Sequence, residues 1–220
     1  MSSHSAREKI LARLRAAKPE LVPLPDVGAY YATRTHEDLE TRVERLALNL
    51  KNAMAEVHRT TVGTLAADLS ALVREKGFGM VAIGPEVVTD SGLSTVLGKI
   101  CTLLPVITPR NDEPALFNQV DAGLTLSHAA IAETGTIVLW CGPQSPRLLS
   151  LVPPVHIAVV DTRRTYDSLF DLMRHEHWAQ GLPTNVVLVS SPSKTADIQQ
   201  TLAYGAHGPK QLIVMLVEDH

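Results

Sequence analysis

Residues 155–161 read VHIAVVD, a short apolar run bounded by turn residues, which is typical of a buried β-strand. A strictly alternating run, VDAGLTLS at 120–127, precedes it. Five further runs predict strands: MVAIG at 80–84, TLLPVIT at 102–108, TIVLWC at 136–141, NVVLVS at 185–190 and QLIVMLV at 211–217. Pro105 argues against a central place for 102–108, because proline donates no hydrogen bond to a sheet.

Helical segments separate several of these strands. We predict helices over 65–76, ending at Gly77, over 166–178 and over 194–203. Strands that alternate with helices indicate an α/β fold with a largely parallel, doubly wound sheet flanked by helices. Sites in such folds lie beyond the carboxyl ends of the strands.

The N-terminal part has a different character. Residues 5–17 predict a short amphipathic helix, and Pro19, Pro23 and Pro25 then indicate an extended arm. We therefore expect two parts, an N-terminal helix with a Pro-rich arm over 1–35 and an α/β domain over 36–220. The arm is expected either to lie on the domain or to reach another subunit.

A longer helix is predicted over 36–58. Its apolar residues are spaced like the seam of a coiled coil: Leu39, Val43, Leu46, Leu50, Ala53 and Val57. The favoured interpretation is a helix that packs along the sheet of its own domain. The alternative is a helix that also pairs with a partner subunit and forms a homo-oligomer.

Composition excludes several classes of protein. The chain has 220 residues, a formal net charge of −3 and 4% aromatic residues, which argues against nucleic-acid binding and acidic membranes. No secretory signal begins the chain, and the longest late apolar run is too short to span a bilayer, so a cytoplasmic protein is expected. Cys101 and Cys141 lack metal-binding spacing. We expect buried thiols, with a disulfide left open, and no cofactor, iron–sulfur cluster or metal in this chain.

The stretch SPSKTADIQQ at 191–200 follows a predicted strand and enters a predicted helix. Ser193, Lys194 and Thr195 would offer hydroxyls, a charge and free backbone N–H groups to a phosphate or carboxylate. The alternative is a capped helix with Asp197 in its first turn. The residues alone favour the cap.

The stretch AETGT at 132–136 offers a second candidate site. Glu133 is suited to act as a general base, a nucleophile or a ligand anchor, and Gly135, between Thr134 and Thr136, permits a close backbone approach. The alternative is a turn in which Glu133 satisfies nearby backbone donors.

Arg147 and His207 complete the candidates. Arg147 is suited to gripping a carboxylate or phosphate, and His207 to moving a proton at neutral pH, although both residues also suit ordinary exposed turns. Lys194 and His207 are expected near opposite ends of the helix predicted at 194–203. His128, Glu133 and His207 match no metal motif.

Four motifs occur in order: AETGT, RxLSLxPPxH, PSKTADI and HGP. Together they resemble the LUD-domain family, and within it the lactate-utilization protein C subfamily, over roughly residues 79–217. The resemblance implies a fold similar to the sugar-phosphate isomerase and CoA-transferase-like superfamily. It also implies a role in oxidising L-lactate to pyruvate with iron–sulfur partner proteins, and site positions at Glu133, Thr134, Gly135, Arg147, Ser193, Lys194, Thr195 and Asp197.

Two functions follow as hypotheses. The first is a subunit of a lactate-oxidising system that binds a small anionic ligand or a partner's surface. The second is a stand-alone enzyme of the transferase or isomerase kind, with Glu133 as base or nucleophile and the 193–195 turn holding phosphate or CoA. Fold resemblance alone is weak support for the second.

Overall fold

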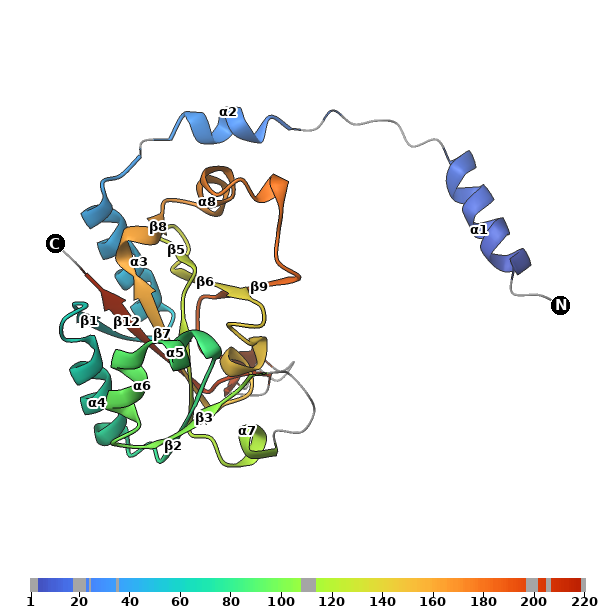
Figure 1. Ribbon diagram of the computed structural model, residues 1–220. Helices are drawn as coiled ribbons and strands as arrows, with labels where there is room; N and C mark the ends of the chain where they lie inside the picture. The colour runs from blue at the N-terminus through green and yellow to red at the C-terminus, as the bar shows by residue number, and fades with distance from the viewer. Residues whose placement is uncertain are drawn as a thin grey trace. The chain divides into compact units, whose positions relative to one another are not determined.

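The structure is a computed structural model, shown in Figure 1. It describes residues 4–17, 23, 25–34, 36–107, 114–196, 202–204 and 207–218. The chain divides into two compact units, Met1–Thr35 and His36–His220. The first unit contains α1 (His4–Ala16), which agrees with the helix predicted at 5–17, and a short helix, α2 (Val27–Ala32).

The second unit is built on a six-stranded sheet in the order β1-β12-β7-β4-β2-β3, in which every neighbouring pair is parallel. Its strands are β1 (Glu56–Thr60), β2 (Met80–Ile83), β3 (Thr102–Pro105), β4 (Ala122–Leu126), β7 (Val155–Asp161) and β12 (Gln211–Val217). Pro105 lies in β3 at the edge of the sheet, where a missing N–H is tolerated. The predicted α/β fold with a largely parallel sheet is confirmed.

A second, four-stranded sheet has the order β8-β5-β6-β9. Its strands are β5 (Ala129–Ile131), β6 (Thr136–Cys141), β8 (Thr165–Tyr166) and β9 (Asn185–Val189). The sequence predicted strands at 136–141 and 185–190 but not a separate sheet, because an apolar run does not reveal its pairing partner. Ile137 and Leu139 of β6 pack against Ala158 and Val214 of the large sheet.

Helices cover the large sheet on one face, and the small sheet covers the other (Figure 1). The longer helices are α3 (Leu39–Asn52) and α4 (Leu65–Lys76); the shorter ones are α5 (Pro85–Thr89), α6 (Ser91–Leu97), α7 (Pro114–Asn118) and α8 (Leu169–His175). Helix α4 has the predicted bounds, and Gly77 ends it with a φ of 69°. Helices α4 and α6 pack on Ile157 and Ile213, while α3 packs beside the small sheet.

The helix predicted over 36–58 is wrong in its last part. Helix α3 ends at Asn52, Met54 takes a φ of 71°, and Val57 belongs to β1. The apolar spacing continues past the helix because the next apolar residues serve a strand. Leu46 and Leu50 are 0% exposed, so this part of the seam packs in the core of its own domain, as the favoured interpretation expects.

The helix predicted over 194–203 is also wrong. Lys194–Ala196 forms β10, which pairs antiparallel with β11 (Leu202–Tyr204). Pairing across the hairpin outweighs the weak helix propensity of so short a segment. Asp197 lies outside the described residues.

Two simpler predictions concern the cysteines and the membrane. Cys101 and Cys141 are buried and unbonded to each other, and burial raises the pKa of both thiols. Within the described parts of the chain, no helix combines the length and apolar character needed to cross a bilayer.

Candidate functional site

The large sheet has a topological switch point between β2 and β4. From the β3 edge, five of its strands follow the order 2-1-3-4-5 of flavodoxin-like sheets, in which ligands bind beside the first and third strands. Here the loop after β6 occupies that place. The backbone N–H of Glu86 donates to the Gln144 carbonyl at 3.2 Å, and a Cβ on Gly84 would lie 2.8 Å from the same oxygen.

The carboxyl group of Glu86 lies beside this loop and accepts a hydrogen bond from Ser145. One Glu86 oxygen accepts the Leu126 N–H at 3.3 Å, and burial raises the pKa of Glu86 despite hydrogen bonds from Ser145 and Leu126. Arg147 begins the short 3₁₀ helix Arg147–Ser150 that follows the loop, and its side chain is exposed. The loop after β6 therefore packs against the residues that follow β2, at the edge where ligands of such sheets bind.

The AETGT stretch forms the turn between β5 and β6. Gly135 has a φ of 59°, and a Cβ there would lie 2.7 Å from the Cβ of Asn49 on α3. The Asn49 side-chain amide donates to the carbonyls of Ala132 at 2.9 Å and Glu133 at 3.2 Å. Glycine is thus required for both its backbone conformation and its close contact with α3.

Further hydrogen bonds join this turn to Ser190, which follows β9, and to Tyr166 and Asp167 at the end of β8. The hydroxyls of Thr134 and Thr136 lie 2.6 Å apart, and Thr136 lies 2.7 Å from the Ser190 hydroxyl. The N–H of Ala132 donates to Tyr166 O at 2.8 Å, and the N–H of Glu133 donates to Asp167 O at 3.0 Å. These are contacts that hold α3, β6 and β8 together, with the Glu133 side chain exposed.

The predicted anion-binding loop lies at the other end of the large sheet. The N–H of Ser193 donates to Pro209 O at 2.8 Å. The backbone N–H of Lys210 donates to Pro154 O at 2.8 Å, where β7 and β12 begin. The expectation that the 193–195 loop and the His207 turn lie apart is wrong, because Gly208 packs on Ser193. Lys194 and Thr195 belong to strand β10 and not to the first turn of a helix, so the helix-dipole argument fails for them.

The predicted site residues therefore fall into separate groups. Glu133, Thr134, Gly135 and Thr136 lie on the carboxyl side of the large sheet, against the segment that follows β7. Ser193, Lys194, Thr195 and His207 lie on its amino side.

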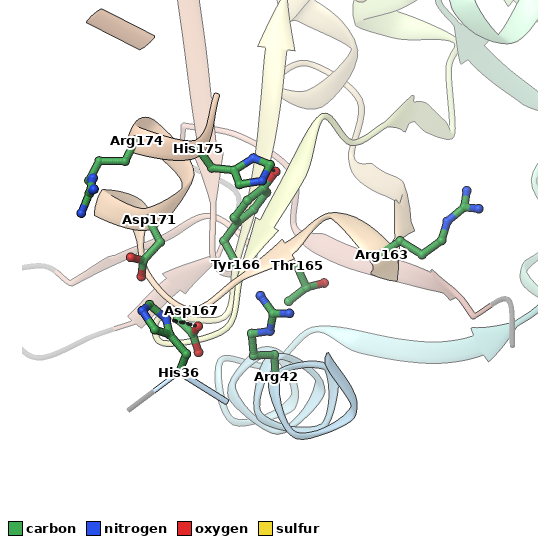
Figure 2. A pocket seen from close by; sticks show the side chains of 9 residues that line it. All are labelled: His36, Arg42, Arg163, Thr165, Tyr166, Asp167, Asp171, Arg174 and His175. Carbon is green, nitrogen blue, oxygen red and sulfur yellow. Dashed lines mark hydrogen bonds and ion pairs between the residues drawn. The ribbon is translucent and has the colours of Figure 1, made fainter. Parts of the chain in front are cut away.

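A cleft of about 520 Å³ lies near the first group, between α3, β8 and α8 (Figure 2). It opens beyond the carboxyl end of β7, where sites of α/β sheets are expected. Its lining is rich in charged groups: His36, Arg42, Arg163, Thr165, Tyr166, Asp167, Asp171, Arg174 and His175. None of these residues was predicted from the sequence.

One wall of the cleft carries polar atoms without a partner. The Nε of Arg42 is buried and makes no hydrogen bond with any described residue. Thr165 is 1% exposed, and its hydroxyl oxygen likewise has no partner within the described chain. In Figure 2 the Arg42 side chain rises from α3 toward Thr165, whereas Arg163 and Arg174 point away. Arg42 thus places a positive charge at this wall, and that charge also acts on Asp38 and Tyr166.

The opposite wall is acidic. His36 Nδ1 lies 3.4 Å from Asp167 Oδ2, and Arg45 Nη2 lies 3.3 Å from Asp167 Oδ1. One nitrogen of His36 and one oxygen each of Asp167 and Asp171 lie within 4.8 Å of one another, so among the described residues these three could hold a cation. The Arg45 charge opposes a metal there. His128, which with Glu133 and His207 matches no metal motif, has its Nε2 at 2.5 Å from Glu176 Oε2.

Tyr166 lies between the two walls (Figure 2). Its hydroxyl is 3.2 Å from His175 Nδ1 and donates to Glu176 Oε1 at 3.4 Å. Burial, with the nearby Glu176 charge, raises the pKa of Tyr166, so the phenol stays neutral at physiological pH. The cleft therefore combines the Arg42 cation, the hydroxyls of Thr165 and Tyr166, and the carboxylates of Asp167 and Asp171.

The sequence held one signal for this cleft. The run DTRRTYD at 161–167 follows directly from the carboxyl end of the strand at 155–161, where site residues are expected. Arg42 gave no such signal, because it is one of several charges on the polar face of a helix.

Comparison with known proteins places these observations in a family. A family model described as the LUD domain matches residues 43–217. An uncharacterized protein of Neisseria meningitidis serogroup B is 36% identical over 224 residues, which covers 98% of this chain and 95% of that protein.

Relatives with informative names are more distant. Lactate utilization protein C 1 of Bacillus mycoides is 28% identical over 172 residues, covering 74% of each chain. Lactate utilization protein C of Bacillus subtilis is 35% identical over 108 residues, covering 46% of this chain and 44% of that protein, which is less than half its length.

The fold also has a solved counterpart. The crystal structure of a DUF162 family protein from Deinococcus radiodurans matches with a TM-score of 0.61 at 22% identity. The match covers 83% of this chain and 99% of that one, and it supports the α/β fold alone.

Proposed function

The chain belongs to the LUD-domain family, and from that premise we propose that it acts in lactate utilization. In this proposal it is a cytoplasmic subunit of a system that oxidises L-lactate to pyruvate. The observation that carries the proposal is its similarity to proteins named lactate utilization protein C, one of them over 74% of both chains.

Iron–sulfur proteins are the proposed partners. The family resemblance implies them, and oxidation of lactate requires an electron acceptor. The chain has two cysteines, both buried, whereas a cysteine-ligated cluster requires four. Electron transfer is therefore assigned to the partner chains.

We also propose that this subunit binds a small anionic ligand. Support comes from the cleft, in which the buried Arg42 Nε and the Thr165 hydroxyl lack partners in the described structure. Buried polar groups are rarely left unsatisfied, and an arginine is well suited to a carboxylate. The ligand site is thus assigned to the cleft and not to the 193–195 loop.

The test is a reconstitution. Lactate-dependent dye reduction is measured in lysate from cells that lack this gene, with purified protein or buffer added back. Loss of activity in the lysate and recovery with the protein support the proposal. Unchanged activity in the mutant lysate would show that this chain has no part in lactate oxidation.

A further inference from the structure

We infer that strand β9, at one edge of the small sheet, pairs antiparallel with β9 of a second copy of this chain. The small sheets of the two copies would then join into one continuous sheet across a two-fold axis. This interface is independent of the proposed role in lactate utilization, and it differs from the helix pairing that was the alternative for residues 36–58.

The edges of the large and small sheets differ in how they are protected. An edge strand offers backbone N–H and C=O groups to other chains, and natural proteins blunt such edges with proline, charge or short length. Strand β3 contains Pro105, and β1 carries Glu56, His58 and Arg59 within five residues. Strand β8 has two residues, and α3 packs beside it. Each of these three edges is therefore a poor partner for another strand.

Strand β9 has none of these protecting features. It reads NVVLV, and the printed sequence has no charged residue from Gly181 to Ser193. Among the described residues β9 pairs with β6 alone, and it lies at the end of the small sheet farthest from α3 (Figure 1). An open edge rich in β-branched residues and free of charge pairs readily with another strand.

The apolar side chains of β9 are incompletely buried. On the face toward the large sheet, Val187 and Val189 pack against the core but remain half-buried. Their neighbours across the ladder in β6 are Leu139 and Ile137, which are 1% and 0% exposed. On the other face, Leu188 is 47% exposed. The apolar layers thus end unfinished at β9, where a further strand would extend them.

A second copy of β9 fits this edge by charge and by symmetry. Antiparallel pairing centred on Val187 would place Leu188 of each copy opposite Val186 of the other, so apolar side chains meet across the ladder. Neither strand carries a charge, so no ion is desolvated and no like charges face each other. A two-fold pairing also uses the free edge of both copies, so assembly stops at the dimer.

The first experiment is light scattering of the full chain from micromolar to millimolar protein. At the highest concentration the mass should approach twice the 23.8 kDa of one chain. A mass of 23.8 kDa at every concentration, or growth beyond two chains, would overturn the inference.

A pair of variants locates the interface. Leu188→Lys puts a charge on each β9 and should raise the dissociation constant of the dimer at least about tenfold. Leu48→Lys is the matched control, because Leu48 is 59% exposed on α3 and should leave the dimer unchanged. A dimer that Leu188→Lys leaves intact, or that Leu48→Lys weakens equally, would contradict pairing through β9.

Hydrogen exchange tests the same edge without a variant. Backbone amides on the free edge of β9 should exchange at least about tenfold more slowly in the dimer than in dilute, monomeric wild-type protein, because pairing hides them from water. If exchange in β9 stays constant while the mass doubles, the dimer forms through another surface and the inference is wrong.

Discussion

The turn at 132–136 and the cleft wall at 165–167 are joined by two backbone hydrogen bonds, yet they use their polar groups in opposite ways. In the turn, Asn49, Thr134 and Thr136 bond to other protein groups. In the cleft wall, the Thr165 hydroxyl has no partner among the described residues. The first region holds structural elements together, whereas the second contains the polar atoms that we propose bind a ligand.

The difference explains why the more conspicuous motif is the less informative one. AETGT is distinctive because Gly135 takes a positive φ, and a Cβ at this position would lie 2.7 Å from the Cβ of Asn49. That requirement is a folding constraint. The proposed ligand site, by contrast, is made from residues without a distinctive motif, two of which have buried polar atoms that lack a partner in the described structure.

A third buried polar group without a partner in the described structure belongs to His156, which is not among the residues that line the cleft between α3, β8 and α8. His156 is fully buried in β7; its Nε2 lies 2.8 Å from the Thr125 hydroxyl, and its Nδ1 has no partner in the described structure. Burial lowers the pKa of His156 to about 4 from a usual 6.5.

The largest predicted effect follows from that shift. The unfolded chain takes up a proton at His156 below about pH 6.5 and the folded chain only near pH 4, so stability present above pH 6.5 is lost as the pH falls. The expected loss is about 3 kcal/mol by pH 4. Urea unfolding at pH 7 and pH 4 measures it against His156→Gln, which should lose correspondingly less. Equal losses in both proteins would contradict a neutral, buried His156.

The next effect tests the turn as a brace. Gly135→Ala should cost about 2–3 kcal/mol, because the strained φ adds to a clash with Asn49. Gly77→Ala is the matched control, since its φ is also positive but nothing lies within 4 Å, and about 1 kcal/mol is expected. Thermal or urea unfolding compares the two. Similar losses would show that the contact with α3 is not what requires glycine.

The smallest effect concerns Glu133. Because the turn uses this residue's backbone and its side chain is exposed, Glu133→Gln should change stability by less than about 0.5 kcal/mol. It should also leave lactate-dependent dye reduction intact. Complete loss of activity in a folded Glu133→Gln protein would instead support the transferase or isomerase alternative.

Much of the fold could be predicted from short apolar runs, and α4 even to its last residue, because Gly77 and the apolar periodicity agree. The predictions were wrong where the local spacing of apolar residues and the pairing of strands disagree. Val57 continues a helical spacing but belongs to a strand, and Lys194 enters a hairpin whose partner strand begins at Leu202. The cleft escaped prediction because Arg42 and Thr165 are 123 positions apart in the printed sequence, and only the packing of α3 against β8 brings them together.

The most direct test of the account is to add L-lactate to ¹⁵N-labelled protein and follow the backbone amide resonances. The largest shifts are expected at Arg42 and at Thr165, Tyr166 and Asp167, which line the cleft. Shifts confined to Ser193, Lys194 and His207, with none in the cleft, would contradict it and return the ligand to the loop at the amino side of the sheet.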